Sequence, residues 1–377
     1  MFILKQGSRN AMNLDRDSPT FMHNFENIFG KRMPHLDTVD EVLAVLDNDE
    51  LERLKAALMK NLIDKKIFNK LRLLGSYYRV AVDGTGIITV KKGHCAHCLK
   101  KESKNGVVTY FHNILEAKLI TPNGFAISLA TEWIENPTEY DKQDCELKAF
   151  RRLADKLKRY FPRLPICLLA DGLYSNKTFF DICHEKDWRY IVTLKDGSLK
   201  SLWEEIDMEL LTSKNHRATA TGAAKQSYRW LGGLPYQTCK LSWLECLESA
   251  DDHAGRFVYV TDLAIDGGNV EEVAASGRLR FKIENEGFNT LKNHGYGLEH
   301  QYSRTSYLAC KNYLSLMHIA HLLNQLYELS PLFKSLIIGK KTIKHLWKQL
   351  VTALSAIVIG ATDLASMHLT RFQIRYE

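Results

Sequence analysis

Two short apolar runs, each ended by an Asp-Gly pair, constrain the fold of this chain more than any other feature. Tyr77–Asp83 is followed by Gly84, and Ile166–Asp171 is followed by Gly172. Such runs predict short buried strands that stop at an Asp-Gly turn. In open α/β sheets, ligand and metal sites lie just beyond the carboxyl ends of the strands. An Asp-Gly pair taken alone is more often only a turn.

A third acid, Glu284, lies in the run Arg278–Tyr296, which is expected to be helical. Glu284 is the only charge on a stripe at 3/4 spacing that also contains Ala274, Gly277, Phe281, Phe288 and Leu291. A buried carboxylate persists when it is paired or binds a metal. Either Arg280, one turn earlier, neutralises Glu284, or Glu284 joins Asp83 and Asp171 in an oxygen-only site for Mg²⁺ or Mn²⁺.

The segments around these acids alternate between strand and helix patterns. The further predicted strands are Gly86–Val90, Val107–Ile120, Phe125–Ile134, 189–194 and Arg256–Asp262, and the predicted helices are Gln143–Tyr160 and 176–186. With Tyr77–Asp83 and Gly86–Val90 taken together, the order is β-β-β-α-β-α-β, and the strand Arg256–Asp262 then precedes the helix with Glu284. Residues 1–75 and those beyond 305 read as helical, whereas 197–255 contains alternating stretches with aromatic residues.

Four pieces of the chain resemble the DDE transposases of prokaryotic insertion sequences, in particular those with a segment inserted between the second Asp and the Glu. They are Val82–Gly86, Lys142–Glu146, Asp171–Asn176 and Arg280–Asn293. The last is similar to the Tyr-Arg-Glu-Lys signature of that group, with Arg280 and Glu284 at the Arg and Glu positions. Gly277 stands at the Tyr position and Leu291 at the Lys position, so Lys292 is the candidate for the phosphate contact.

The resemblance implies an RNase H-like fold, which is a mixed α/β sheet flanked by helices and here interrupted by a β-rich insertion. The expected units are a helical N-terminal region (1–75), the first part of the catalytic core (76–196), the insertion (197–255), the final core strand with the Glu-bearing helix (256–304) and a helical C-terminal region (305–377). Related chains usually begin further upstream with helices that bind transposon ends. A shortened N-terminus and an alternative start are both open.

The implied activity is cleavage of transposon ends and joining of the 3′-hydroxyl to target DNA. Asp83, Asp171 and Glu284 would hold two Mg²⁺ or Mn²⁺ ions, with Asp83 shared by both. The candidate DNA contacts are Arg278, Arg280, Lys282, Lys292, His294, Trp230 and Trp243. The tryptophans would stack on a base, although a tryptophan is more often a core residue. Glu286, the rival of Glu284, reads as a surface residue.

The expected partners are double-stranded DNA, as inverted-repeat ends and target, and a second copy of the chain in a homodimer. A truncated or decayed transposase that binds DNA as a non-catalytic regulator is the alternative function. A third interpretation, a metal-dependent nuclease for other nucleic acids, is disfavoured by the inserted segment and the Arg280–Lys292 motif. Paired carboxylates also occur in glycoside hydrolases, but no sugar platform is visible.

Composition agrees with a DNA partner but does not require one. The net charge of +7 mildly favours a polyanion. The longest apolar run, Leu350–Thr362, is too short to span a bilayer. Residues 1–32 do not read as a signal peptide, and the cysteine positions suggest no disulfide framework. The chain is therefore expected in the cytoplasm, associated with the nucleoid.

Two further features each allow two interpretations. The run His94–Cys98 contains the pair Cys95 and Cys98, which is half of a zinc site or part of an ordinary reduced loop. Further zinc ligands could come from His112, Cys145 or Cys183. The predicted helix Gln143–Tyr160 carries a basic face that either contacts DNA or is simply solvated. That face consists of Arg151, Arg152, Lys156, Lys158 and Arg159.

Overall fold

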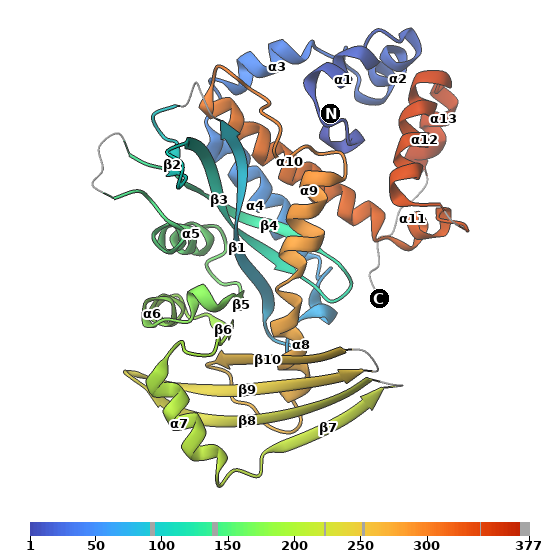
Figure 1. Ribbon diagram of the computed structural model, residues 1–377. Helices are drawn as coiled ribbons and strands as arrows, with labels where there is room; N and C mark the ends of the chain where they lie inside the picture. The colour runs from blue at the N-terminus through green and yellow to red at the C-terminus, as the bar shows by residue number, and fades with distance from the viewer. Residues whose placement is uncertain (91–94, 138–141, 222–223, 251–252, 340, 370–377) are drawn as a thin grey trace.

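The computed structural model describes residues 1–90, 95–137, 142–221, 224–250, 253–339 and 341–369. Within these residues one twisted sheet of ten strands runs through the molecule (Figure 1). The strands are β1 (Tyr78–Val90), β2 (Leu99–Glu102), β3 (Val108–Ile120), β4 (Ala126–Ile134), β5 (Ile166–Ala170), β6 (Arg189–Thr193), β7 (His216–Thr221), β8 (Ala224–Tyr236), β9 (Cys239–Ala250) and β10 (His253–Thr261). Their order is β2-β3-β1-β5-β6-β10-β9-β8-β7, and β4 pairs with β3.

The five central strands, β4-β3-β1-β5-β6, have the order and directions of an RNase H-like sheet. β3 is antiparallel to both β1 and β4, whereas β1, β5 and β6 run parallel to one another. Every residue of β5 is buried, as expected for a parallel strand covered on both faces. The predicted mixed α/β sheet flanked by helices is confirmed.

β1 differs from its prediction because it does not stop at Asp83. It continues to Val90 as one strand, which includes the predicted separate strand Gly86–Val90. β3 pairs with both halves of β1, and the irregularity in the register falls between Gly86 and Ile88. The local turn preference of Asp83-Gly84 is therefore overridden by cross-strand pairing with a long neighbour.

Helices cover both faces of the central strands (Figure 1). On one face, Val80 and Val82 of β1 share a core with α5 (Glu146–Tyr160) and α6 (Lys177–Glu185). On the other face, Ala81 shares a core with α8 (Val270–Leu279) and the segment after it. The remaining α-helices are α1 (Arg9–Asp15), α2 (Pro19–Phe29), α3 (Leu36–Leu43), α4 (Asn48–Asp64), α7 (Lys200–Leu210), α9 (Thr290–Asn293), α10 (Tyr307–Glu328), α11 (Pro331–Leu336), α12 (Ile343–Ala356) and α13 (Ala361–Leu369).

The segment 197–255 extends the same sheet. β7, β8 and β9 pair in sequence order, and β9 pairs with β10, which is antiparallel to β6. The segment begins with α7, a helix that the alternating pattern did not predict. Leu202 and Ile206 of α7 are fully buried, and their i, i+4 spacing is the signal that indicates this helix.

The terminal regions are helical, as predicted. Helices α1 to α4 precede the sheet, and α10 to α13 follow it. In Figure 1 the N-terminal helices lie beside α10 and α12 at the end of the molecule opposite β7–β10. Among the described residues, no helix combines the length and the apolar character needed to cross a bilayer.

Candidate active site

Strand register brings Asp83 and Asp171 to the same level of the sheet. The parallel pairing of β1 with β5 ends at Ala81 and Leu169, and each aspartate comes two residues later. Adjacent strands lie about 4.8 Å apart, so residues at one level on adjacent strands are neighbours. Asp171 directly follows β5, and its Oδ1 accepts a hydrogen bond from the backbone N–H of Leu173 at 2.8 Å. Strand pairing therefore holds Asp83, and the one-turn 3₁₀ helix Gly172–Tyr174 that follows β5 holds Asp171.

Asp83 is half-buried and forms an ion pair with Arg280. Arg280 Nη1 lies 3.0 Å from Asp83 Oδ2. Burial raises the pKa of Asp83 above its ordinary value, Arg280 opposes that rise, and the charges of Asp171 and Glu284 add to it. Arg280 thus has Asp83 as its described partner, which corrects the interpretation that Arg280 neutralises Glu284.

Glu284 does not occupy the buried position predicted for it. Residues Ile283–Asn289 form a π-helix, in which each turn holds more residues than an α-helical turn. The 3/4 stripe is interrupted at Phe281, which is 52% exposed, and at Glu284, which is exposed, and it resumes with the buried Phe288. Ile283, which was not on the predicted stripe, is buried next to Glu284. Burial is the main cause of the raised pKa of Asp83, and the charge of Glu284 makes the smallest contribution to it, so Glu284 lies within electrostatic range of Asp83.

A buried lysine beneath the π-helix determines how that helix packs on the sheet. The side chain of Lys118 from β3 would lie 3.1 Å from a Cβ at Gly287, so it packs into the space left by that glycine. Its ammonium group lies 5.5 Å from the centre of the Phe288 ring and 3.3 Å from a carboxylate oxygen of Glu116. Lys118 and Glu116 are both fully buried. The segment that carries Glu284 is thus positioned by tertiary contacts.

Sequence reasoning missed a fourth carboxylate, Glu146, at the start of α5. Its Oε1 accepts a hydrogen bond from the hydroxyl of Tyr174 at 2.8 Å, and its Oε2 lies 2.7 Å from the place that a Cβ on Gly84 would occupy. Burial raises the pKa of Glu146, Tyr174 lowers it, and the charges of Asp83 and Asp171 raise it. The sequence signal that could have identified Glu146 is the transposase-like motif Lys142–Glu146, of which it is the last residue.

The structure also accounts for the glycine at position 277. A Cβ there would lie 2.6 Å from the ring of Tyr259, a buried residue of β10. The ring of Tyr259 therefore fills the space that a side chain at position 277 would need. A tyrosine at position 277, as in the signature, would be incompatible with this arrangement.

Gly277→Ala is expected to lower the free energy of unfolding by a net amount of about 1–2 kcal/mol, because the added methyl group forces the Tyr259 ring to move, at a cost of about 1–3 kcal/mol. The gain of about 1 kcal/mol from replacing a helical glycine by alanine is smaller than the cost of such a clash. Denaturant unfolding would measure the change. In a Tyr259→Leu background the same substitution should cost nothing or stabilise, and an equal loss in both backgrounds would contradict this role of the Tyr259 ring.

The other predicted DNA-contacting cations are distributed over several surfaces. Three of them form ion pairs within the chain: Arg278 with Glu248, Lys282 with Glu286, and Lys292 with Glu299. His294 lines a cavity of about 920 Å³ beside α12, and this cavity includes neither Asp83 nor Asp171. Among the seven predicted contacts, Arg280 is the one with a described ion pair to a predicted catalytic acid.

The predicted stacking of Trp230 and Trp243 on a DNA base is corrected by their burial. Trp230 in β8 is 8% exposed and Trp243 in β9 is 1% exposed. Both rings pack in hydrophobic cores, so neither has an open face for a base. Trp230 and Trp243 are therefore core residues of the sheet, as the alternative interpretation holds.

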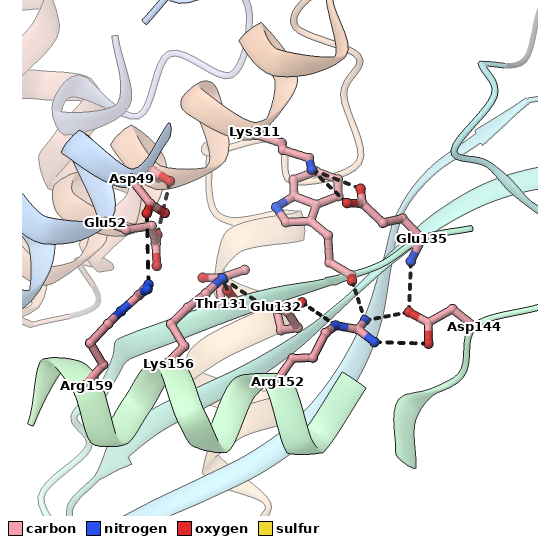
Figure 2. A network of polar contacts seen from close by, with 12 residues as sticks. Asp49, Glu52, Thr131, Glu132, Glu135, Asp144, Arg152, Lys156, Arg159 and Lys311 are labelled. Atoms are coloured by element: carbon pink, nitrogen blue, oxygen red, sulfur yellow. Dashed lines mark hydrogen bonds and ion pairs between the residues drawn. The ribbon is translucent and has the colours of Figure 1, made fainter. Parts of the chain in front are cut away.

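Two cations of α5, Arg152 and Lys156, attach that helix to β4. Figure 2 shows Arg152 between Glu132 and Asp144, with N–O distances of 2.7 and 2.5 Å, and Lys156 at 2.9 Å from Glu132. Arg152 Nη2 also donates to the carbonyl oxygen of Trp133 at 3.2 Å. These contacts favour a structural role for Arg152 and Lys156 and fix the orientation of α5, which begins with Glu146.

The acidic residues suit a hard divalent cation by their chemistry. Asp83, Asp171, Glu284 and Glu146 offer only oxygen atoms, and one guanidinium, that of Arg280, is paired with them. They do not form a closed cage. Among the described residues, the one set of three or more potential ligands whose donor atoms all lie within 4.8 Å of one another is Cys95, Cys98 and His112.

Comparisons with known proteins identify no close relative. No protein-family model matches the chain, and no curated protein matches it. Among solved structures, it is similar to the piggyBac transposase in its synaptic complex with hairpin DNA, with a TM-score of 0.34 and 9% identity. The match covers 74% of this chain and 57% of the other, so the chain spans little more than half of that protein. A likeness at this level is distant and says nothing about activity.

Proposed function

We propose that this chain is a DDE transposase of a DNA insertion sequence, which cleaves transposon ends and joins the resulting 3′-hydroxyl to target DNA. The observation that carries the proposal is the register of β1 and β5, which sets Asp83 level with Asp171. Glu284 is the proposed third acid of the site, and the contribution of its charge to the pKa of Asp83 supports this assignment. Asp83, Asp171 and Glu284 also lie in the motifs by which the chain resembles the DDE transposases.

Asp83, Asp171 and Glu284 are the proposed ligands of two Mg²⁺ or Mn²⁺ ions, with Asp83 shared. When bound, such ions neutralise the scissile phosphate and activate the attacking and leaving oxygens. Burial is the main cause of the raised pKa of Asp83, and the charges of Asp171 and Glu284 add to it. A bound cation would favour the charged form of all three carboxylates. Glu146 lies beside Gly84 and is proposed to orient this group from outside the ligand set.

Arg280 has two roles in this proposal. It holds the Asp83 carboxylate in place through one N–H group. A guanidinium has five N–H donors, and we propose that another of them contacts a DNA phosphate, which would position the strand without reading its sequence. Double-stranded DNA is the proposed substrate. A homodimer on paired ends and a nucleoid-associated location in the cytoplasm stay predictions.

The proposal is tested by a nicking assay on DNA that carries the repeats flanking the gene, with Asp171→Asn as the control. The expected result is formation of a 3′-hydroxyl end that requires Mg²⁺ or Mn²⁺ and disappears in the variant, because the variant lacks one proposed ligand. Tight binding to the repeats without nicking by either protein would refute the catalytic proposal and favour the non-catalytic regulator. Nicking that Asp171→Asn retains would refute the proposed site.

A further inference from the structure

Cys95, Cys98 and His112 converge on one point near β2 and β3, apart from the acidic site. The two sulfur atoms are 3.6 Å apart, and His112 Nε2 lies 3.3 Å from Cys95 Sγ and 3.2 Å from Cys98 Sγ. In a tetrahedral zinc site, metal–ligand distances of about 2.3 Å for sulfur and 2.0 Å for nitrogen place sulfurs about 3.8 Å apart and sulfur and nitrogen about 3.5 Å apart. The three donor atoms therefore form a slightly contracted face of such a tetrahedron.

The surrounding structure holds these side chains in position without a metal. Asn136 donates from Nδ2 to the carbonyl oxygen of Cys98 at 3.0 Å, and its backbone N–H donates to the carbonyl oxygen of His97 at 3.2 Å. The ring of Tyr307 from α10 stacks on His112 at 4.6 Å. His112 and Cys98 are 4% and 7% exposed, so the donor atoms are largely shielded from water.

Neither a disulfide nor an ordinary reduced loop accounts for this arrangement as well as a metal site does. A disulfide requires an S–S distance of about 2.05 Å, far below the separation of Cys95 and Cys98. In a reduced loop without a metal, the single lone pair of His112 Nε2 can accept a hydrogen bond from only one thiol, so hydrogen bonding alone gives no reason for both sulfurs to approach it. Two sulfurs and one ring nitrogen at nearly equal distances are instead the soft donor set that selects Zn²⁺.

We propose that Cys95, Cys98 and His112 bind one structural Zn²⁺ ion, with Cys310 of α10 as the fourth ligand. Cys310 lines the same cavity as the other three side chains, which has a volume of about 110 Å³. Its sulfur donates to the carbonyl oxygen of Ser303 at 3.2 Å, and the proposed coordination requires it to leave this hydrogen bond. His94 lies outside the described residues. The ligands thus come from the turn before β2, from β3 and from α10.

Such an ion would stabilise the connection that leads to Glu146. Tyr307, stacked on His112, donates to Glu135 at 2.6 Å, and the backbone N–H of Glu135 donates to Asp144 at 3.2 Å. Asp144 is in turn paired with Arg152 of α5, as Figure 2 shows. The zinc site would therefore link β3, α10 and the segment between β4 and α5. Its existence does not depend on the proposed transposase activity.

The test is the zinc content of tag-free protein purified under reducing conditions from zinc-supplemented cells. The wild-type chain is expected to hold about one zinc ion, and Cys98→Ser and His112→Asn less than about a tenth of that, because each removes one ligand. Cys239→Ser, a change at a half-buried cysteine of β9, is the matched control and should keep the ion. Cys310→Ser should weaken retention during dialysis against a chelator.

A second measurement covers the case in which the ligand variants fail to fold. Wild-type protein in which Co²⁺ replaces the metal should show the visible absorption of tetrahedral, thiolate-bound cobalt, and alkylation of cysteines should release the ion. Wild-type protein that contains no zinc and gives no such cobalt spectrum would overturn the proposal. Zinc that Cys98→Ser retains as fully as Cys239→Ser would also overturn it.

Discussion

Asp83→Asn is expected to reduce divalent-ion-dependent nicking of repeat DNA at least about 100-fold, because even outer partners of metal sites contribute 10–100-fold. Asp83 is the proposed ligand of both ions, and an amide keeps the shape of the side chain while removing its charge. The measurement is the initial rate of 3′-hydroxyl formation under Mg²⁺ and under Mn²⁺. Asp181→Asn, at an exposed aspartate of α6 paired with Lys177, is the matched control and should keep its activity.

A thermal unfolding measurement separates this loss from misfolding. Burial and the neighbouring acids raise the pKa of Asp83, so its charged form is destabilised in the folded chain. The asparagine variant loses its pair with Arg280 but also loses this repulsion. Its Tm should therefore be equal to or higher than that of the wild type, as is common at active sites. Full nicking activity in Asp83→Asn would contradict the proposed site.

Glu284→Gln is expected to reduce nicking by a similar factor of about 100, whereas Glu286→Gln should keep activity within about threefold. Glu284 is exposed in the π-helix and electrostatically coupled to Asp83, while Glu286 is paired with Lys282 at 2.6 Å. The same nicking assay, run with the two variants side by side, measures the difference. The two residues lie on one short segment, so each variant controls for the other.

Glu146→Gln is the informative third variant in that series. Glu146 is also electrostatically coupled to Asp83 and Asp171, from the opposite face of the sheet. Because Glu146 is proposed to orient the site and not to bind the ions, Glu146→Gln should lose less nicking activity than Glu284→Gln. Full activity in Glu284→Gln together with near-complete loss in Glu146→Gln would show that the third acid of the site is Glu146. Equal losses in Glu284→Gln and Glu286→Gln would refute the assignment of Glu284.

Much of the core fold is predictable because its signals are local. The runs that became β3, β4, β5 and β6 are each apolar enough to read as strands, and α5 and α6 carry helical periodicity between them. Their order restricts the sheet to very few topologies. The sequence did not reveal α7 because a helix of only a few turns in an otherwise strand-like segment has a weak periodic signal.

The errors at the candidate site arise where tertiary contacts outweigh local preference. An Asp-Gly pair favours a turn, yet β3 pairs with β1 from Val80 to Val90 and keeps Asp83 inside a strand. Regular α-helical spacing predicts a buried Glu284, yet the packing of Lys118 against Gly287 accompanies a π-helix that exposes it. No local pattern encodes either contact, because in each case the partner comes from a separate element, β3.

The sequence by itself determined which residue types are available: two aspartates in Asp-Gly pairs, a helical glutamate, a Cys-x-x-Cys pair and the apolar runs that bury the sheet. The tertiary structure alone decided which of them meet. The parallel register sets Asp83 level with Asp171, α5 brings Glu146 to Gly84, and β3 brings His112 to Cys95 and Cys98. The physical reason is that side-chain periodicity depends on neighbours within a few residues, whereas strand register and helix packing depend on the whole core.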